Sequence, residues 1–307
     1  MTQRFDFTVS QEQSTLRLDQ LLGQAVPGLS RTRARQILLQ GGVFVEKKRV
    51  KVASRTLRAG QRVTVHFEPD AAPRDTKSNW EIPIVALFDD YLVVNKPSGL
   101  ASAPTPSSDQ NDVVFYLRRQ LRALAQNDEL FVIHRLDQPT SGVMIFARNS
   151  STAASLSLAL ADHSIDRQYL ALMLTPTEDD ARIDAAIDGK PAVTHFSILE
   201  RRGAVSLVHA RLETGRTHQV RIHAEAWGCP IFGDAKYGRR LMHAATRQGR
   251  SALGRPPRLA LHAFRLKLPA LGHADSALFE CPLAQDLERF WQAQNADLLP
   301  KRDPEHL

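Results

Sequence analysis

One carboxylate, Asp137, stands in the stretch "HRLDQPTSG", residues 134–142, between an arginine and a run of turn-forming residues. Asp, Pro, Ser and Gly that follow an apolar run such as "FVI" are typical of a strand that ends in a tight turn. A carboxylate presented by such a turn can also act as a nucleophile or as a general base. From this stretch alone, Asp137 is either a turn residue or a catalyst.

A second polar cluster lies in "ETGRTHQVRIHAEAWGCPIFGDAKYG", residues 213–238. Its segment "HQVRIH" alternates polar and apolar residues, which predicts a strand that presents Arg221 and Gln219 on one side. An arginine that faces a pocket requires an anionic partner, and Asp137 is a candidate. His218 and His223 are five residues apart in the sequence and would lie on opposite faces of this strand, so we expect no metal site.

Several other kinds of active site lack their sequence signatures. The chain has no G-x-x-x-x-G-K-[ST] or G-x-G-x-x-G loop, which disfavours ATP and nicotinamide chemistry, and no G-x-S-x-G nucleophile motif. It has no C-x-x-C or H-E-x-x-H zinc motif. Cys229 and Cys281 are too few for a disulfide framework, and we interpret both as core thiols.

The elements that must position these residues follow from the apolar pattern after residue 80. "GVMIFARN", "RQYLALML" and "THFSILERR" are typical of strands, and "IPIVALFDDYLVVNKPSGL" predicts paired strands that lead into a turn at Lys96 and Pro97. "DVVFYLRRQLRAL" and "STAASLSLALADH" have helical periodicity. Because strands outnumber helices and follow one another singly or in pairs, we expect an α+β fold with a mixed, largely antiparallel sheet and flanking helices.

The basic residues are concentrated at the N-terminus. The chain has 307 residues, enough for two domains, and a net charge of +7. Residues 1–65 contain 12 Lys and Arg against 4 Asp and Glu, whereas the other 242 residues contain 28 against 29. Such a local surplus favours a nucleic acid as partner. No stretch has the length of a membrane helix or the plan of a signal peptide, so we expect a cytoplasmic protein without membrane association.

The basic segment has the pattern of a small domain. "RLDQLLGQAV" predicts an amphipathic helix, and a second helix, "RTRARQILLQ", is expected to begin after Ser30 as N-cap and to end at Gly41 and Gly42. Short alternating strands follow, the last of them "RVTVHF". Residues 66–79 are rich in Pro, Ala and polar residues and lack apolar periodicity, which indicates a linker.

This N-terminal segment resembles the small RNA-binding domain named after ribosomal protein S4. The matching stretches are "LRLDQLL", "LSRTRARQIL", "GGVFVEKKRVK" and "LRAGQRVTV", which occur in the expected order between residues 15 and 66. The resemblance implies that basic residues of the second helix and of the turn after it lie against RNA phosphates, which position a protein without specifying a base. These residues are Arg31, Arg33, Arg35, Lys47 and Lys48.

The rest of the chain resembles the RluA-type RNA pseudouridine synthases. "HRLDQPTSG", "RQYLAL" and "TGRTHQVRIHAEAWGCPIFGDAKYG" carry the resemblance, together with "LVVNKPSGL" and "RLALHAFRL". It implies that Asp137 is the catalytic carboxylate, that Tyr169 lies over the uracil ring, and that Arg221 is the partner of Asp137. The expected substrate is uridine in 23S ribosomal RNA, with transfer RNA as the second choice. Further RNA contacts are expected from Arg135, Arg216 and His218.

The chemistry of this isomerisation fits those residue types. The bond between uracil nitrogen 1 and the anomeric carbon breaks, the uracil turns, and carbon 5 joins the ribose, so nothing is oxidised and we expect no cofactor. A carboxylate in a dry pocket keeps its charge more easily beside an arginine. A tyrosine offers a flat face for stacking and a hydroxyl that can help to remove the carbon-5 proton. The target base must leave its RNA stack, and Arg135 is expected to fill the vacated space or to hold the phosphate.

Two features depart from the family pattern. The lysine that is common two residues before the tyrosine is replaced by Arg167, which keeps the charge and changes the hydrogen-bonding shape. Residues 239–258 carry six arginines and no acidic residue. We interpret this long connection either as a loop that contacts RNA, with Arg247 and Arg250 among its contacts, or as a freely solvated loop.

A non-catalytic RNA-binding or ribosome-assembly protein is the main alternative function, although such a protein would not require Asp137, Tyr169 and Arg221 together. Glycoside hydrolysis is disfavoured because it needs two carboxylates and "HRLDQPTSG" supplies one. We expect a monomer. Its predicted parts are an S4-like domain in residues 1–66, a linker in 67–80, a catalytic domain in 81–290 and a polar tail in 291–307.

Overall fold

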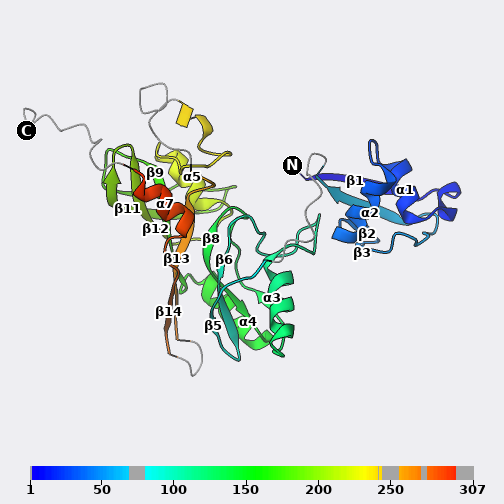
Figure 1. Ribbon diagram of the computed structural model, residues 1–307, viewed down its shortest axis with the longest axis horizontal. Helices are drawn as coiled ribbons and strands as arrows, with labels where there is room; N and C mark the ends of the chain where they lie inside the picture. The colour runs from blue at the N-terminus through cyan, green and yellow to red at the C-terminus, as the bar shows by residue number, and fades with distance from the viewer. Residues whose placement is uncertain (1, 69–79, 241, 244–255, 271–274, 295–307) are drawn as a thin grey trace, which may run out of the picture. The chain divides into compact units, whose positions relative to one another are not determined.

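The chain forms two compact units, Met1–Glu81 with Ala101–Gln126, and Ile82–Leu100 with Asn127–Leu307. Figure 1 shows their helices and strands. Among the described residues, no helix combines the length and the apolar character that crossing a bilayer requires. The structure is a computed structural model that describes residues 2–68, 80–240, 242–243, 256–270 and 275–294.

The first unit contains an antiparallel sheet of four strands, counted over the described residues, in the order β1-β4-β2-β3. A short 3-10 helix, Glu12–Thr15, precedes two helices, α1 (Leu18–Ala25) and α2 (Arg31–Gln40), which pack against each other. The strands are β1 (Gln3–Thr8), β2 (Val43–Val45), β3 (Lys48–Arg49) and β4 (Arg62–Phe67).

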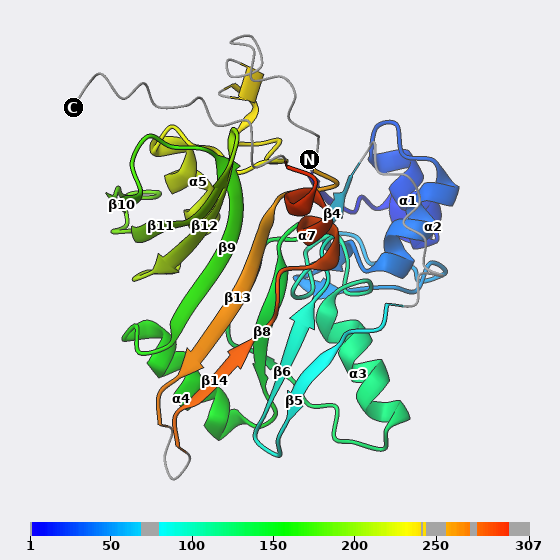
Figure 2. The same ribbon diagram turned by 60° about the vertical axis from the view of Figure 1, so that its left-hand side comes forward.

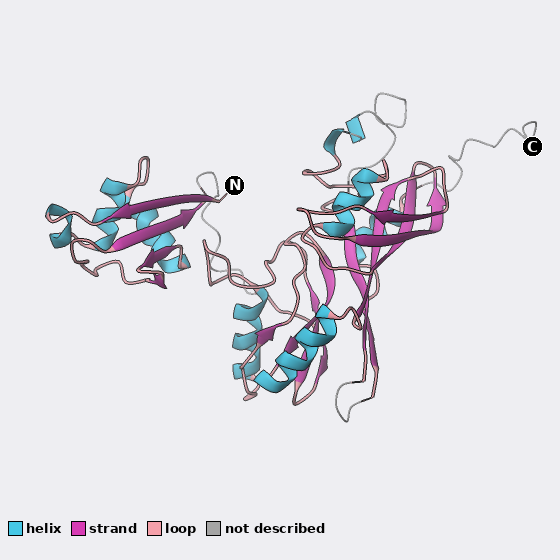
Figure 3. Cartoon of the chain, turned by 180° about the vertical axis from the view of Figure 1, so that it is seen from behind, coloured by secondary structure: helices cyan, strands magenta, loops and turns pink. Residues whose placement is uncertain are grey.

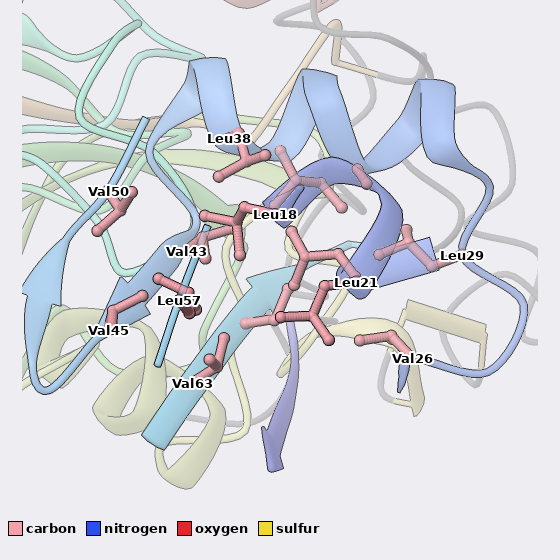
Figure 4. Close-up of a cluster of buried hydrophobic side chains, with 14 of the residues drawn as sticks. Leu18, Leu21, Val26, Leu29, Leu38, Val43, Val45, Val50, Leu57 and Val63 are labelled. Carbon is pink, nitrogen blue, oxygen red and sulfur yellow. The ribbon is translucent and has the colours of Figure 1, made fainter. Parts of the chain in front are cut away.

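The caps of α2 are those predicted from the sequence. The Ser30 hydroxyl accepts the amide N–H of Arg33, which satisfies one of the free donors at the start of the helix. Gly41 ends the helix with a φ of 86°, a left-handed conformation that glycine adopts without a steric penalty. Both helices bury their apolar face against the sheet. The core that they form is shown in Figure 4 and includes Leu18, Leu21, Leu38, Val43, Val45 and Val63.

Residues Ala101–Gln126 belong to this unit although they follow the first strands of the second unit. They form the loop before α3 (Val113–Ala123) and the helix itself. The loop is tied to the end of the small sheet, because Nη2 of Arg49 donates a 2.9 Å hydrogen bond to the carbonyl of Thr105. Nζ of Lys51 also lies 2.6 Å from Oδ1 of Asp109.

The second unit is built on one large sheet of ten strands, again counted over the described residues. The order is β10-β11-β12-β9-β13-β8-β6-β5, with β14 beside β13 and β7 beside β8, and the long curved strands are visible in Figure 2. The expectation of a mixed, largely antiparallel sheet is confirmed. The strands are β5 (Ile84–Leu87), β6 (Tyr91–Lys96), β7 (Phe131–Val132), β8 (Ser141–Ala147), β9 (Asp166–Leu174), β10 (Asp180–Asp184), β11 (Val193–Arg202), β12 (Val205–Leu212), β13 (Leu261–Leu268) and β14 (Ala277–Glu280).

A single parallel contact joins the two halves of this sheet. The other strand pairs described are antiparallel, whereas β8 and β13 run parallel and share only the pairs Ser141↔His262 and Gly142↔Ala263. Gly142 has a φ of 118°, and a Cβ at this position would collide with the backbone of Ala263. Glycine is therefore required where β13 approaches β8.

Helices α4 (Ser150–Ala161), α5 (Gln219–Ala226) and α7 (Gln285–Gln292) accompany the large sheet, as Figure 3 shows. Helix α7 extends two residues into the tail that was predicted to begin at 291, and Trp291 in this extension is buried. Residues 69–79 of the predicted linker and 295–307 of the predicted tail lie outside the described residues.

The predicted strand in "HQVRIH" is wrong, because Gln219–Ala226 form the helix α5. The same letters contain a helical set, in which Val220, His223 and Ala224 are buried at spacings of three and four. Gln219 and Arg221 are also buried, and each forms hydrogen bonds to distant segments of the chain. These two buried polar residues gave the sequence the alternating polar and apolar pattern of a strand. His218 and His223 therefore do not lie on opposite faces of a strand, because His218 immediately precedes the helix and His223 lies within it.

Candidate active site

Asp137 lies in a tight turn between β7 and β8. Its carbonyl accepts the amide N–H of Thr140 at 3.0 Å, which closes the turn, and β8 starts at the next residue, Ser141. The turn-forming letters of "HRLDQPTSG" therefore do make a turn. The Asp137 side chain is 20% exposed, so the turn also presents its carboxylate to solvent.

Arg221, on α5, reaches this carboxylate. Its Nη1 donates a 2.9 Å hydrogen bond to Oδ2 of Asp137. The other two donors on the guanidinium fork go to Asp234, from Nε to Oδ2 at 2.7 Å and from Nη2 to Oδ1 at 2.9 Å. A planar fork held at both sides in this way has a fixed direction. Arg221 therefore bridges two carboxylates from different segments of the chain.

Asp234 is the buried end of this bridge, since its side chain is only 1% exposed. Its Oδ1 also accepts the backbone N–H groups of Lys236 and Tyr237, at 2.9 and 3.0 Å. Burial alone would raise the pKa of Asp234, but the Arg221 guanidinium and the two amides outweigh burial and lower it. Asp234 thus stays ionised and anchors Arg221.

His218 and Tyr237 border the other oxygen of Asp137. Nε2 of His218 lies 3.7 Å from Oδ1 of Asp137, and Nδ1 of His218 pairs with the hydroxyl of Tyr237 at 2.8 Å. His218 has a φ of 59°, a left-handed conformation that is uncommon outside glycine, and it immediately precedes α5. Burial is the main cause of the lowered pKa of His218.

Tyr169 lies in β9 and is buried. Burial raises the pKa of its hydroxyl, the nearby Arg167 charge opposes this, and the Asp137 carboxylate adds to the rise. Tyr169 is therefore a neutral phenol near the carboxylate. Arg167, two residues earlier on the same strand, is also buried, and Nε of Arg167 has no hydrogen-bond partner among the described residues. A side chain at Gly215 would collide with the Arg167 guanidinium.

Lys96, at the end of β6, contacts the backbone of the turn that carries Asp137. It is completely buried, and Nζ donates to the carbonyls of Pro97, Leu100 and Gln138 at 2.9, 2.6 and 3.1 Å. Gln138 is the residue directly after Asp137. Burial and the Arg258 charge lower the pKa of Lys96 to about 7, against the opposing effect of Asp137. Lys96 thus fastens the Asp137 turn to the loop after β6.

Comparison with known proteins identifies the family. A family model described as RNA pseudouridylate synthase matches residues 90–226, and one described as S4 domain matches residues 16–63. The ribosomal large subunit pseudouridine synthase D of Nitrosomonas europaea is 34% identical over 309 residues, which cover 94% of this chain and 87% of the relative. The chain belongs to the RluA-type RNA pseudouridine synthases. It is therefore an isomerase, and its S4 domain is an RNA-binding module.

Two further proteins are similar to this synthase. The ribosomal large subunit pseudouridine synthase D of Salmonella typhimurium is 30% identical over 321 residues, which cover 99% of this chain and 98% of the relative. The human RNA Pseudouridylate Synthase Domain Containing 4 has a similar structure, with a TM-score of 0.57 and 24% identity over 68% of this chain and 92% of that chain. The structural likeness confirms the fold expected for the catalytic part.

The basic residues predicted to contact RNA in the S4 domain of the synthase fall into two groups. Lys47 and Lys48 are exposed, Lys47 in the turn between β2 and β3 and Lys48 at the start of β3. Arg31 and Arg35 lie together on α2, and each donates from Nε to Oδ2 of Asp19, at 3.0 and 2.7 Å.

Arg33 has different partners from its two neighbours on α2. It donates to Oε1 of Gln36 and to the carbonyl of Glu68, each at 3.1 Å. Of the three predicted arginines on α2, two therefore share Asp19 as their partner and the third, Arg33, points to other partners.

The remaining predicted RNA contacts of the synthase lie in the second unit. Arg135 is exposed two residues before Asp137, and Nε of Arg216 donates to the carbonyl of Pro191 at 3.1 Å. His218, predicted as an RNA contact, lies beside the Asp137 carboxylate, as described above. Arg247 and Arg250 lie outside the described residues.

The arginine-rich connection 239–258 ends at a residue with a structural role. Arg258 donates from Nε and Nη2 to the two oxygens of Asp286, at 2.7 and 2.9 Å, and from Nη2 to Oγ of Ser141 at 3.0 Å. This residue ties the end of the connection to α7 and β8.

Three supporting residues of the synthase were missed by sequence reasoning, namely Asp19, Lys96 and Asp234. Each stands in a stretch that carried a family resemblance, "LRLDQLL", "LVVNKPSGL" and "PIFGDAKYG". The sequence did carry a signal for them. Each is a charged residue inside an apolar or turn-forming stretch, and such a stretch is normally buried.

Proposed function

We propose that this synthase isomerises specific uridines in the 23S ribosomal RNA of the large subunit, with Asp137 as the catalytic carboxylate. The observation that carries the proposal is the bridge from Asp234 through Arg221 to Asp137. In this bridge Oδ2 of Asp137 accepts the hydrogen bond from Arg221, whereas Oδ1 of Asp137 faces His218 at 3.7 Å. One oxygen is thus anchored and the other is free to attack or to accept a proton.

The geometry supports distinct roles for the groups around the uridine. Arg221 stabilises the negative charge of Asp137 while the glycosidic bond breaks and re-forms. Tyr169 offers the face of its ring to the uracil. Because the Tyr169 hydroxyl is a neutral phenol, it can take the carbon-5 proton only while passing its own proton to a neighbouring acceptor. The reaction moves one bond from nitrogen 1 to carbon 5 and one proton from carbon 5 to nitrogen 1, so the atoms balance without a co-reactant.

Access of the uridine to this site requires that the base leave its stack. Arg135 is exposed next to the Asp137 turn and carries a charge that suits either the vacated space or the flanking phosphate. Arg216 and His218 stand at the N-terminal side of α5 and complete the proposed set of RNA contacts in this part of the chain.

The first experiment compares Asp137→Asn with the wild type in single-turnover pseudouridine formation at saturating enzyme. Asn keeps the size and turn-forming capacity of Asp but cannot attack or accept a proton usefully. We expect the rate to fall by about 10³-fold or more while the dissociation constant for the same RNA is unchanged. Asp188→Asn, in an exposed turn where Asp188 has a φ of 50°, is the matched control and should keep full activity. A wild-type rate for Asp137→Asn would leave Asp137 as a turn residue.

The choice of RNA is tested separately. Two relatives of the synthase are named as ribosomal large subunit enzymes, which favours 23S ribosomal RNA over transfer RNA. Pseudouridines would be mapped in both RNAs from cells with and without this protein. Sites lost only from transfer RNA would contradict the ribosomal assignment.

We also assign RNA anchoring to residues 1–66 and chemistry to residues 81–290, joined by 67–80. The basic surplus of residues 1–65 supports this division. A chain lacking residues 1–79 also loses the contacts of Arg49 and Lys51 with residues 105 and 109, so its melting curve is recorded first. When folded, it should keep single-turnover activity at saturating enzyme but bind RNA more weakly at moderate salt. Equal affinity of the truncated and full chains would contradict the division. The monomeric state stays a prediction, which sedimentation of the full chain tests.

A further inference from the structure

A buried arginine on β9 has no partner in the part of the chain that the structure describes. Arg167 is 8% exposed, and its guanidinium forms no hydrogen bond or ion pair with a described residue. Asp166, the residue before it, bonds instead to Arg211 and Gln168. A buried charge without a partner is unfavourable, and such exceptions are expected at functional sites. The partner of Arg167 is therefore expected to be a molecule that binds to the protein.

Arg167 lies on the same face of the sheet as Tyr169. The two residues are two positions apart in β9, and alternate residues of a strand point to the same face. Strand β9 runs between β12 and β13, as Figure 2 shows. Burial raises the pKa of the Tyr169 hydroxyl, the Arg167 charge opposes this rise, and the Asp137 carboxylate adds to it. Tyr169 therefore lies near both Arg167 and Asp137.

The guanidinium of Arg167 packs against the loop that leads to α5. A Cβ at Gly215 would collide with Nη1 of Arg167 and would lie 3.0 Å from Cζ and Nη2, so the loop backbone lies directly beside the fork. The loop is fixed by Gln219, whose Oε1 accepts the Thr214 hydroxyl at 2.8 Å and the Arg216 N–H at 2.9 Å. A rigid loop thus holds the Arg167 side chain in place where no anion does.

The groups near Arg167 do not neutralise its charge. Tyr169 is a neutral phenol. Burial and the Arg167 charge lower the pKa of His134 to about 3, and Nε2 of His134 accepts a backbone N–H at 3.2 Å, so His134 is neutral as well. Asp137 is negative, but its Oδ2 accepts the hydrogen bond from Arg221. The charge of Arg167 is therefore available to a bound substrate.

The isomerisation moves negative charge from Asp137 to the uracil. When Asp137 bonds to the anomeric carbon or takes a ribose proton, its carboxylate loses its charge, and the electron pair of the glycosidic bond stays on uracil nitrogen 1. The detached ring shares this charge with its two carbonyl oxygens. The charge returns to Asp137 when carbon 5 joins the ribose. Arg221 pairs with the charge while it is on Asp137, so a second cation is needed where the charge develops on the uracil.

We propose that Arg167 is a catalytic residue that donates hydrogen bonds from Nη1 and Nη2 to the detached uracil and stabilises its negative charge. The inference rests on the proposed role of Asp137. The burial of Arg167 favours a flat base over a hydrated backbone phosphate, and a planar fork suits the edge of a planar ring. Because the fork binds the anion more strongly than the neutral uracil of the bound RNA, its effect is on the rate and not on RNA affinity.

The first test measures single-turnover pseudouridine formation at saturating enzyme, on the RNA that the mapping experiment identifies. Arg167→Met should slow the reaction about 10²- to 10³-fold while the Kd for the RNA stays within about twofold of the wild type. Arg167→Lys keeps the charge without the fork and should recover at least about tenfold of this loss. A wild-type rate for Arg167→Met, or equal rates for Arg167→Met and Arg167→Lys, would overturn the proposal.

Arg211→Met is the matched control for this test. Arg211 lies on β12, beside β9, and its side chain is 61% exposed and pairs with Asp166. The substitution removes the same charge from a neighbouring strand and should leave the single-turnover rate unchanged. A loss of rate in Arg211→Met equal to that in Arg167→Met would mean that only total charge matters and would overturn the proposal.

The second test is thermal stability, for which two explanations predict different results. If Arg167 serves the fold, Arg167→Met lowers the melting temperature, and slow turnover reflects a damaged protein. If Arg167 is kept for an anion, the substitution removes an unpaired buried charge, and the melting temperature stays the same or rises. A melting temperature of Arg167→Met several degrees below that of the wild type, or a failure of this variant to fold, would overturn the proposal.

The third test identifies the group that Arg167 contacts. RNA with 2-thiouridine or 4-thiouridine at the target position replaces one uracil carbonyl oxygen by sulfur, a weaker acceptor. For at least one of these RNAs, the effects of the thio substitution and of Arg167→Met on the single-turnover rate should depart from additivity by about fivefold or more. Additive effects in both RNAs would overturn the proposal. So would a phosphate contact, in which Arg167→Met raises the Kd about tenfold, reduces its salt dependence and leaves the rate intact.

Failure of this inference differs from failure of the proposed function. A wild-type rate for Asp137→Asn would count against the proposed catalytic carboxylate. A wild-type rate for Arg167→Met together with an inactive Asp137→Asn would count against the uracil contact only. Pseudouridines mapped to transfer RNA would change the substrate of the assay and leave the comparison of Arg167→Met with the wild type as it stands.

Discussion

Arg221 donates both Nε and Nη2 to Asp234, at 2.7 and 2.9 Å, and by this pair of bonds its remaining Nη1 is aimed at Asp137. The buried carboxylate of Asp234 comes from a segment that lies 13 residues beyond Arg221. Asp234, which binds the guanidinium at different nitrogens from the one that reaches Asp137, therefore sets the direction of the Arg221 side chain.

Asp234→Asn should impair turnover without impairing RNA binding. The variant breaks a buried ion pair, so the free energy of unfolding should fall by about 3–5 kcal/mol. The single-turnover rate should fall about 10- to 100-fold, because Arg221 is less well held beside Asp137. Asp286→Asn is the control for the loss of a paired carboxylate, since Asp286 also accepts Nε and Nη2 of an arginine, Arg258, although its side chain is 38% exposed. If Asp286→Asn slows turnover as much, the effect of Asp234→Asn reflects general destabilisation.

Lys96→Met should loosen the turn that carries Asp137. The variant leaves three carbonyls without their buried donor, and we expect the free energy of unfolding to fall by about 2–4 kcal/mol. The value of kcat should fall more than KM changes, because the RNA contacts remain. Chemical denaturation and steady-state kinetics measure the two effects. Lys190→Met, at an exposed turn position, is the control, and an unaltered kcat in a destabilised Lys96→Met protein would limit Lys96 to the fold.

Tyr169→Phe separates the two properties proposed for this side chain. Phe keeps the aromatic face, so the Kd for RNA should stay within about twofold of the wild type. Loss of the hydroxyl should slow single-turnover pseudouridine formation about 10²-fold. Tyr169→Leu should lose the stacking face as well and form product more slowly still. A wild-type rate for Tyr169→Phe would exclude the hydroxyl from proton transfer.

The stability of the second unit should decrease in acid through His262. This residue is completely buried. Nε2 donates to the carbonyl of Cys281 at 3.0 Å, and Nδ1 pairs with Ser141 at 2.8 Å. Burial lowers its pKa to about 4, against the opposing hydrogen bond to Cys281. Between pH 6.5 and 4 the unfolded chain therefore binds a proton that the folded chain does not.

The resulting loss of stability from His262 should be about 1.4 kcal/mol for each pH unit below 6.5, and it should be absent above this pH. His262→Gln should remove this one-proton dependence, although it also lowers stability at pH 7. Urea denaturation at several pH values measures the slope. An equal slope in His262→Gln and the wild type would show that other groups dominate acid unfolding.

Local features of the sequence predicted much of the secondary structure. Ser30 and Gly41 mark the two ends of α2 because capping depends on residues next to the helix. The strands β8, β9 and β11 were recognised because their apolar residues stand in short runs or alternate with polar residues. The pairing of Asp137 with Arg221 was predicted from charge and family resemblance, and it is present in the structure although Arg221 lies on a helix.

Relations that depend on tertiary contacts could not be predicted in this way. Lys96 was interpreted as a turn residue, and its sequence neighbours do not reveal that three carbonyls enclose Nζ, one of them from Gln138. Asp19 follows Leu18 in a helix with an ordinary apolar face, and Arg31 and Arg35 become its partners only when α1 and α2 pack together. The helix at Gln219–Ala226 was missed because its buried polar residues find partners in distant segments, which a local pattern does not record.

The parallel contact of β13 with β8 joins two halves of the sheet that are made at different times during translation. Asp137 lies between β7 and β8, within the half of the sheet that contains β5 to β8, whereas Arg221 follows the half that contains β9 to β12. The strand that pairs with both β8 and β9 is β13, and it begins only at Leu261. Contacts between such distant segments form late and slowly. During translation both halves are therefore made before the strand that joins them, and the sheet that supports both Asp137 and Arg221 is incomplete until Leu261–Leu268 have been made.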